Sequence, residues 1–210
     1  MSRAAAKDRG RLFVISAPSG AGKTSLVRAL MTREPGLRFS ISCTTRKQRE
    51  SEVDGHDYFF VKRDEFERMA AAGEFLEHAQ VFDNFYATPR RPVEDALAAG
   101  QDLILEIDWQ GAAQVRAAMP ECISIFILPP SRAELERRLR ARGTDTEQVI
   151  QRRLADAAAD MTHWREFEFL VVNDDFRRAT DELADVVHGR GSAARSDRPG
   201  LAGFVAALTG

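Results

Sequence analysis

The chain has 210 residues, a length that suits one well-packed domain with inserted lobes and is short for two ordinary domains. Its 30 basic and 32 acidic residues give a formal net charge of −2 at pH 7, so the composition points to no nucleic acid and no acidic membrane as partner. No run reaches the roughly 20 apolar residues that cross a bilayer, and the N-terminal residues lack the apolar core of a signal peptide. We therefore expect a cytoplasmic protein.

The two cysteines, Cys43 and Cys122, lie in short alternating apolar runs and have no C-x-x-C spacing. The four histidines are scattered along the chain and give no ligand spacing either. We expect two buried thiols in a reducing compartment, with neither a disulfide nor a metal cage.

The stretch from Phe13 to Leu26 predicts a strand, a glycine-rich loop and the first turn of a helix. Its first three residues are apolar, a proline and two glycines interrupt the run, and apolar residues then recur at helical spacing. In such a loop, successive backbone N–H groups and the N-terminal end of the following helix face a phosphate group. The pattern G-x-x-x-x-G-K-[ST] fits residues 17–24 except at its first position, which is Ala17.

Lys23 and Thr24 are the residues of this loop that would carry chemistry. In the pattern, the lysine supplies positive charge to the phosphates and the hydroxyl group binds Mg²⁺. The alternative is an ordinary turn whose lysine points at water, but the coincidence of strand, turn, Gly-Lys-Thr and helix favours the phosphate site. The predicted contacts are Ala17, Pro18, Ser19, Gly20, Ala21, Gly22, Lys23, Thr24 and Ser25.

Several elements are expected between this loop and the next buried strand. The first helix ends near Glu34, because proline and glycine follow it. A half-buried strand over 38–45 leads into a basic loop, 45–49, which either holds a second anion or is only solvated. The remaining elements are a short strand over 56–61, a short helix over 64–72 that opens with a capping box, and a helix over 89–99.

The apolar run from Leu103 to Asp108 predicts a strand that ends in two carboxylates, Glu106 and Asp108, on one side of the strand. Ligands of open α/β sheets lie at such strand ends. These carboxylates can hold a Mg²⁺-bound water or orient a substrate, and the alternative is that they only face solvent. A helix over 109–119 and a buried strand over 123–128 follow, and this alternation predicts an α/β fold with a mostly parallel sheet.

The next part of the chain is rich in arginine. A capping box at Ser131-x-x-Glu134 opens a helix, and six arginines follow it before residue 154. They form either a solvated face or the cationic helix-loop-helix of a lid that closes over the phosphate loop. We then expect a core strand over 169–173 and a helix over 181–188. A flexible linker over 189–200 and an apolar segment over 201–208, which docks on the core or on a neighbouring chain, complete the chain.

Several motifs in this order resemble the guanylate kinase family of nucleoside-monophosphate kinases, over residues 11–188. They are Ser16-Ala-Pro-Ser-Gly-Ala-Gly-Lys-Thr24, Thr44-Thr-Arg-Lys-Gln-Arg49, Gly55-His-Asp-Tyr-Phe-Phe60, Glu74-Phe-Leu-Glu-His-Ala79, Leu105-Glu-Ile-Asp-Trp-Gln-Gly111, Arg140-Ala-Arg-Gly-Thr144 and Val172-Asn-Asp-Asp175. The resemblance implies a P-loop NTPase-type core (11–37, 99–136 and 158–188), an inserted α+β GMP-binding lobe (38–98) and a helical lid (137–157). A flexible N-terminal tail (1–10) and a linker with a C-terminal tail (189–210) flank this domain.

The resemblance also implies an activity, the transfer of the γ-phosphate of ATP to GMP or dGMP with Mg²⁺, in a possible homo-oligomer. In the family, the positions of Ser42, Arg46, Arg49, Tyr58 and Tyr86 bind the GMP phosphate, and those of Glu77, Thr88 and Asp108 read the guanine edge. Arg138, Arg142 and Arg153 belong to the lid and contact the ATP phosphates or the transferring group, and Asn173 lies near the adenine. The catalytic set is Lys23, Arg46, Arg138, Arg142 and Arg153, with Thr24 at the metal.

Three positions depart from the family pattern. Ala17 replaces the first glycine of the general loop pattern, and Glu106 stands where aspartate is usual. In Ala87-Thr88-Pro89, alanine replaces the glycine that precedes the hydroxyl residue. This last change puts the backbone at the guanine pocket in question, because alanine tolerates a positive φ poorly.

Two other protein classes compete with a kinase. A non-catalytic guanylate-kinase-like interaction module, which binds a phosphopeptide, typically has a degraded phosphate loop, whereas Gly20, Gly22, Lys23 and Thr24 are intact here. No SH3-like or PDZ-like region fits in the remaining length. A P-loop GTPase is disfavoured because no Asn-Lys-x-Asp motif follows. ATP consumption that requires GMP separates the three classes.

Overall fold

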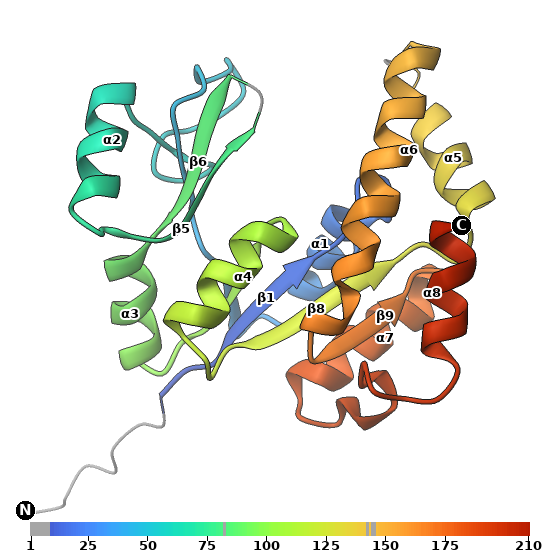
Figure 1. Ribbon diagram of the computed structural model, residues 1–210. Coiled ribbons are helices and arrows are strands. Elements are labelled where there is room, and N and C mark those ends of the chain that lie inside the picture. The colour runs from blue at the N-terminus through green and yellow to red at the C-terminus, as the bar shows by residue number, and fades with distance from the viewer. Residues whose placement is uncertain (1–8, 82, 142, 144–145) are drawn as a thin grey trace, which may run out of the picture. The chain divides into compact units, whose positions relative to one another are not determined.

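The computed structural model describes residues 9–81, 83–141, 143 and 146–210, and its contacts divide the chain into two compact units (Figure 1). The first unit contains residues up to Leu12, Gly36–Leu105 and Gln110–Cys122. The second contains Phe13–Pro35, Glu106–Trp109 and Ile123–Gly210. Within the described ranges, no helix combines the length and the apolar character that a membrane span requires.

Parallel strands form the centre of the second unit. Strand β8 (Ile123–Leu128) pairs in parallel with β1 (Leu12–Ser16) on one side and with β9 (Phe169–Val172) on the other. Nearly every residue of these strands is buried, as expected for continuous apolar runs that helices cover on both faces. The three strands predicted from apolar runs, and the α/β class with a mostly parallel sheet, are confirmed.

Three helices of the second unit begin at a residue whose side chain accepts a hydrogen bond from a backbone N–H of the first turn. The Ser131 hydroxyl accepts from the Glu134 backbone N–H at 3.1 Å, and the Asp175 carboxylate accepts from that of Arg178 at 2.8 Å. The second cap explains why the predicted helix over 181–188 in fact begins at residue 176. The helices are α1 (Lys23–Arg33), α5 (Arg132–Arg140), α6 (Glu147–Met161), α7 (Phe176–Val187) and α8 (Leu201–Thr209), with 3-10 helices η1 (Thr162–Glu166) and η2 (Gly191–Ala194).

The segment 189–200, expected as a flexible linker, packs against the sheet instead. The Ser196 N–H donates to the Glu168 carbonyl oxygen at 2.9 Å, and the Arg198 guanidinium donates to that of Leu170 at 2.9 Å. These contacts cover β9 at the outer side of the three strands, where unpaired backbone groups need partners. The apolar segment that follows forms α8, which packs on α6, so of the two expected alternatives the segment docks on its own chain.

Two groups of strands belong to the first unit. Strand β2 (Leu37–Phe39) pairs in parallel with β7 (Asp102–Glu106). A separate four-stranded sheet has the order β4-β3-β6-β5, in which only the β3–β4 pair is parallel. Its strands are β3 (Cys43–Thr44), β4 (Phe59–Phe60), β5 (Phe75–Val81) and β6 (Asn84–Pro89).

A small core supports one face of this four-stranded sheet. Cys43, Phe66, Phe75 and Ala87 are buried together between the sheet and α2 (Arg63–Ala71). The remaining helices within the described ranges are α3 (Arg90–Ala98) and α4 (Trp109–Ala118), close to the predicted ranges. Both cysteines are buried, as predicted.

Three predictions for this region are wrong in detail. The strand expected over 38–45 is two strands, β2 and β3, in different sheets, so Phe39 is 43% exposed where alternation predicted burial. Asp64 lies in the first turn of α2 rather than at its cap, since the N-cap residue is Lys62 and makes no side-chain cap. The strand expected over 56–61 is reduced to the two residues of β4.

Candidate active site

The phosphate loop lies between β1 and α1 of the second unit and has the backbone that the motif requires. Gly20 and Gly22 have φ angles of 90° and 93°, in the region that favours glycine. A Cβ atom on Gly22 would collide with the side-chain nitrogen of Asn173, so a larger residue there would require the Asn173 side chain to move. The loop therefore has the backbone conformation in which successive N–H groups and the N-terminus of α1 can bind a phosphate.

Lys23, the first residue of α1, carries the positive charge of this loop. Its ammonium group donates to the Ile107 carbonyl oxygen at 2.8 Å. Burial lowers the pKa of Lys23, while the carboxylates of Glu106, Asp108 and Asp160 oppose that shift. The arrangement places a partly buried cation next to acidic groups at the carboxyl end of β7.

Thr24 and Glu106 form the candidate cation site. The Thr24 hydroxyl donates to the Glu106 carboxylate by a short hydrogen bond, and Asp108 follows two residues later. A hydroxyl and carboxylates are the hard oxygen ligands that Mg²⁺ prefers. In the part of the chain that the structure describes, no three potential ligands of the His, Cys, Asp or Glu type form a cluster, so the rest of the coordination shell would come from phosphate oxygens and water.

Two predicted nucleotide-binding residues donate hydrogen bonds to the backbone of the phosphate loop. The Asn173 amide donates to the Ala21 carbonyl oxygen at 2.7 Å, and the Arg138 guanidinium donates to the same oxygen at 3.2 Å. Arg138 also donates to the Asn173 carbonyl oxygen at 2.9 Å. Of the other lid arginines, Arg153 is half-buried on α6, and Arg142 lies outside the described residues.

Three of the five predicted GMP-phosphate residues lie together in the first unit. The Arg46 guanidinium carbon lies 5.5 Å from the ring centre of Tyr58, and the ring centres of Tyr58 and Tyr86 lie 6.1 Å apart, edge to face. Tyr86 faces Thr44 across the β3–β6 pair. Arg49 projects outward with a side chain that is 73% exposed, and Ser42 precedes β3. A cation and two hydroxyl groups thus form one potential anion site.

The predicted guanine-reading pair is buried in the same unit. Glu77 of β5 faces Thr88 of β6, and the Thr88 hydroxyl donates to the Glu77 carboxylate at 2.7 Å. Glu77 is only 5% exposed. Ala87 lies within β6 and pairs with Cys43 and His78, so this position does not require a positive φ, contrary to our concern. Asp108, predicted to read the same base, belongs to the second unit.

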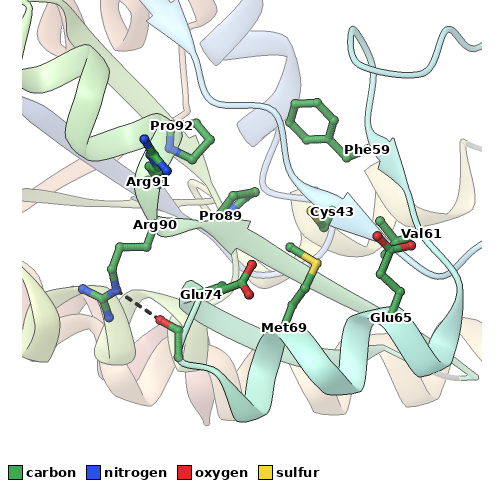
Figure 2. A pocket seen from close by; sticks show the side chains of 11 residues that line it. Cys43, Phe59, Val61, Glu65, Met69, Glu74, Pro89, Arg90, Arg91 and Pro92 are labelled. Carbon is green, nitrogen blue, oxygen red and sulfur yellow. Dashed lines mark hydrogen bonds between the residues drawn. The ribbon is translucent and has the colours of Figure 1, made fainter.

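A cavity of about 720 Å³ lies on the other face of the four-stranded sheet (Figure 2). Cys43, Val61 and Met69 line it, and they extend the small core beneath α2. Side chains alternate across a strand, so Thr44, Tyr86 and Thr88 face away from this cavity. The cavity is therefore separate from the predicted GMP contacts. Burial raises the pKa of the Cys43 thiol in its wall to about 11, which keeps the thiol protonated at neutral pH.

Motif reasoning missed one residue that organises the basic loop. The Glu52 carboxylate accepts from Arg46 and from the backbone N–H of Arg49. Glu52 lies in an irregular stretch where no periodic pattern indicates what a side chain contacts. Its only sequence signal is a glutamate close to a cluster of basic residues.

Together, a glycine-rich phosphate loop with lysine and threonine on a parallel α/β core defines a nucleotide-binding protein of the phosphoryl-transfer class. A sequence model of guanylate kinase matches residues 9–190. The chain is 53% identical over 202 residues to the guanylate kinase of Methylococcus capsulatus, covering 96% of this chain and 99% of that protein. It is 52% identical to that of Escherichia coli strain K12, covering 85% and 87%.

A solved structure agrees with these sequence relatives. The crystal structure of guanylate kinase from Anaplasma phagocytophilum matches with a TM-score of 0.69 and 34% identity, and the match covers 95% of each chain. The chain therefore belongs to the guanylate kinase family, as its motifs predicted.

Proposed function

We infer that this chain is an ATP:GMP phosphotransferase, which converts ATP and GMP, and also dGMP, to ADP and GDP or dGDP in purine nucleotide metabolism. The observation that carries the inference is the intact phosphate loop, in which Lys23 and Thr24 meet the carboxylates at the end of β7. The first unit adds a separate anion site around Arg46. One site suits the donor triphosphate and the other an acceptor monophosphate.

The reaction brings two polyanions together, so the protein must align and neutralise them rather than supply a nucleophile. A phosphate oxygen of GMP attacks the γ-phosphorus, and the bond from that phosphorus to the β–γ bridging oxygen breaks to release ADP. Lys23, Arg138, Arg142 and Arg153 stabilise the charge on the transferring group. Ser42, Arg46, Arg49, Tyr58 and Tyr86 hold the acceptor phosphate.

The remaining contacts determine which two nucleotides bind and where each one lies. The loop residues Ala17–Ser25 surround the ATP phosphates, and Asn173 supports the loop and lies on the adenine side. Glu77, Thr88 and Asp108 read the guanine edge. Thr24 would hold Mg²⁺, Glu106 and Asp108 would orient water bound to the ion, and the ion would supply positive charge to the phosphates.

The enzyme works in the cytoplasm on soluble nucleotides, without a nucleic acid or a membrane as partner. The net charge of −2 and the burial of both cysteines support this location. A homo-oligomer is compatible with this activity, because each chain carries both predicted nucleotide sites.

A coupled assay of ADP release tests the proposed activity. Purified protein with ATP and Mg²⁺ should release ADP rapidly only when GMP or dGMP is added, because the acceptor phosphate is the nucleophile. AMP, CMP and UMP serve as matched acceptors. ADP release that is independent of GMP would indicate a nucleotide hydrolase, and no release with any monophosphate would indicate an interaction module.

The lobe over 38–98 and the lid over 137–157 should both close when both nucleotides bind. Closure excludes water from the phosphates, which strengthens the ionic contacts and prevents hydrolysis of ATP. Small-angle X-ray scattering should therefore show a smaller radius of gyration with GMP plus a non-hydrolysable ATP analogue than without ligand. An unchanged radius under saturating ligand contradicts the assignment of these segments as moving parts.

A further inference from the structure

We propose that Glu52 is a positioning residue for the acceptor phosphate, acting through Arg46. This proposal rests on the assignment of Arg46 and Arg49 to the GMP phosphate made above. The Arg46 Nη2 group donates to Glu52 Oε1 at 2.7 Å, and its Nη1 group donates to Oε2 at 3.0 Å. This is the bidentate geometry that fixes both the direction and the plane of a guanidinium.

Glu52 also shapes the loop that carries both arginines. Its Oε2 atom accepts from the Arg49 backbone N–H at 2.9 Å, and its own N–H donates to the Arg49 carbonyl oxygen at 3.0 Å. The Gln48 side chain donates to the Glu52 carbonyl oxygen at 2.7 Å. One residue therefore anchors the turn from Arg46 to Arg49 by its side chain and by its backbone.

The Arg46–Glu52 pair differs from the many exposed ion pairs of this protein. The side chains of Arg46 and Glu52 are only 17% and 14% exposed, whereas the side chain of Arg49 is 73% exposed. The Arg46 guanidinium also lies over the rings of Tyr58 and Phe60, at 5.5 and 5.7 Å. Arg46 is thus held by protein contacts before any phosphate binds, whereas the exposed Arg49 guanidinium lies 3.9 Å from the Glu52 carboxylate.

A carboxylate beside an anion-binding arginine could instead compete with the ligand. The geometry favours positioning, because a guanidinium carries five N–H donors and a bidentate carboxylate does not exhaust them. A side chain that is already ordered loses less conformational entropy when the ligand binds, which is the advantage of preorganisation. Glu52 also secures the Arg49 backbone, a contact that competition for the phosphate would not require.

Steady-state kinetics of Glu52→Gln tests this role, with Glu50→Gln as the matched control, because Glu50 is an exposed glutamate of the same loop. We expect Glu52→Gln to raise the KM for GMP about tenfold, equivalent to about 1.4 kcal/mol, and to leave the KM for ATP within about twofold. Glu50→Gln should change neither value. An unchanged or lowered KM for GMP in Glu52→Gln would overturn the proposal, and a lowered value would identify Glu52 as a competitor.

A double-mutant cycle separates positioning from a general loss of structure. If Glu52 acts chiefly through Arg46, Glu52→Gln should raise the KM for GMP much less in an Arg46→Ala background than in the unmodified protein, because only its contact with the Arg49 backbone then remains. An equal rise in both backgrounds would overturn the proposal. If the enzyme assignment is wrong, the unmodified protein does not turn over GMP. If only the Glu52 role is wrong, the unmodified protein turns over GMP and Glu52→Gln does not raise the KM for GMP.

Discussion

Replacing Lys23 with alanine should leave the protein folded and lower its turnover number by about 10³-fold or more, the scale on which a charge that serves phosphoryl transfer acts. The Lys23 side chain is partly buried, so its attraction to a phosphate is screened less than that of a surface lysine. In the structure it donates to the Ile107 carbonyl oxygen, a neutral acceptor that a phosphate can replace. The measurement is kcat under saturating ATP and GMP.

Lys62→Ala is the matched control for this prediction. Lys62 is an exposed lysine that precedes α2, so its removal changes the net charge equally without touching the phosphate loop. Its turnover should be unchanged, and circular dichroism should show both variants folded. Near-normal turnover in folded Lys23→Ala protein would contradict the mechanism, because no other residue of α1's first turn carries a positive charge.

The parts of the fold that local sequence determines were predictable. Strand β8 has the bounds that its apolar run predicts, and α5 begins after the capping serine. The division of 38–45 between β2 and β3 was not predictable, because periodicity does not show which sheet a strand joins. The partners of these two strands, β7 and β6, lie far along the chain.

In the candidate site, too, the sequence predicts local motifs but not contacts between distant residues. The phosphate loop is a local motif, so Lys23, Thr24 and the two glycines could be named from the sequence. The contact of Asn173 with Ala21 joins residues 152 positions apart, and only the fold reveals it. Glu52 reaches Arg46 across an irregular loop, where neither helical nor strand spacing relates the two residues.

Guanine specificity is the largest effect that we expect: kcat/KM for GMP should exceed that for AMP by about 10⁴-fold. A site that hydrogen-bonds its substrate rejects an analogue that lacks the bonding groups on this scale. The Glu77 carboxylate is buried and accepts one bond from Thr88, and a carboxylate has about four lone-pair positions, so it can also accept from a base. Guanine presents N1–H and N2–H donors together, whereas adenine presents a bare N1 acceptor.

Glu77→Gln should therefore lower kcat/KM for GMP by about 10²-fold. A hydrogen bond to a charged acceptor is lost, and the amide NH₂ group that replaces one carboxylate oxygen would face the N–H donors of guanine. The KM for ATP should stay within about twofold, because Glu77 belongs to the acceptor lobe. Glu74→Gln, at an exposed glutamate just before β5, makes the same charge change and should leave both values unaltered. If the unmodified protein phosphorylates AMP or UMP as readily as GMP, or if Glu77→Gln retains full kcat/KM for GMP, Glu77 does not read the base.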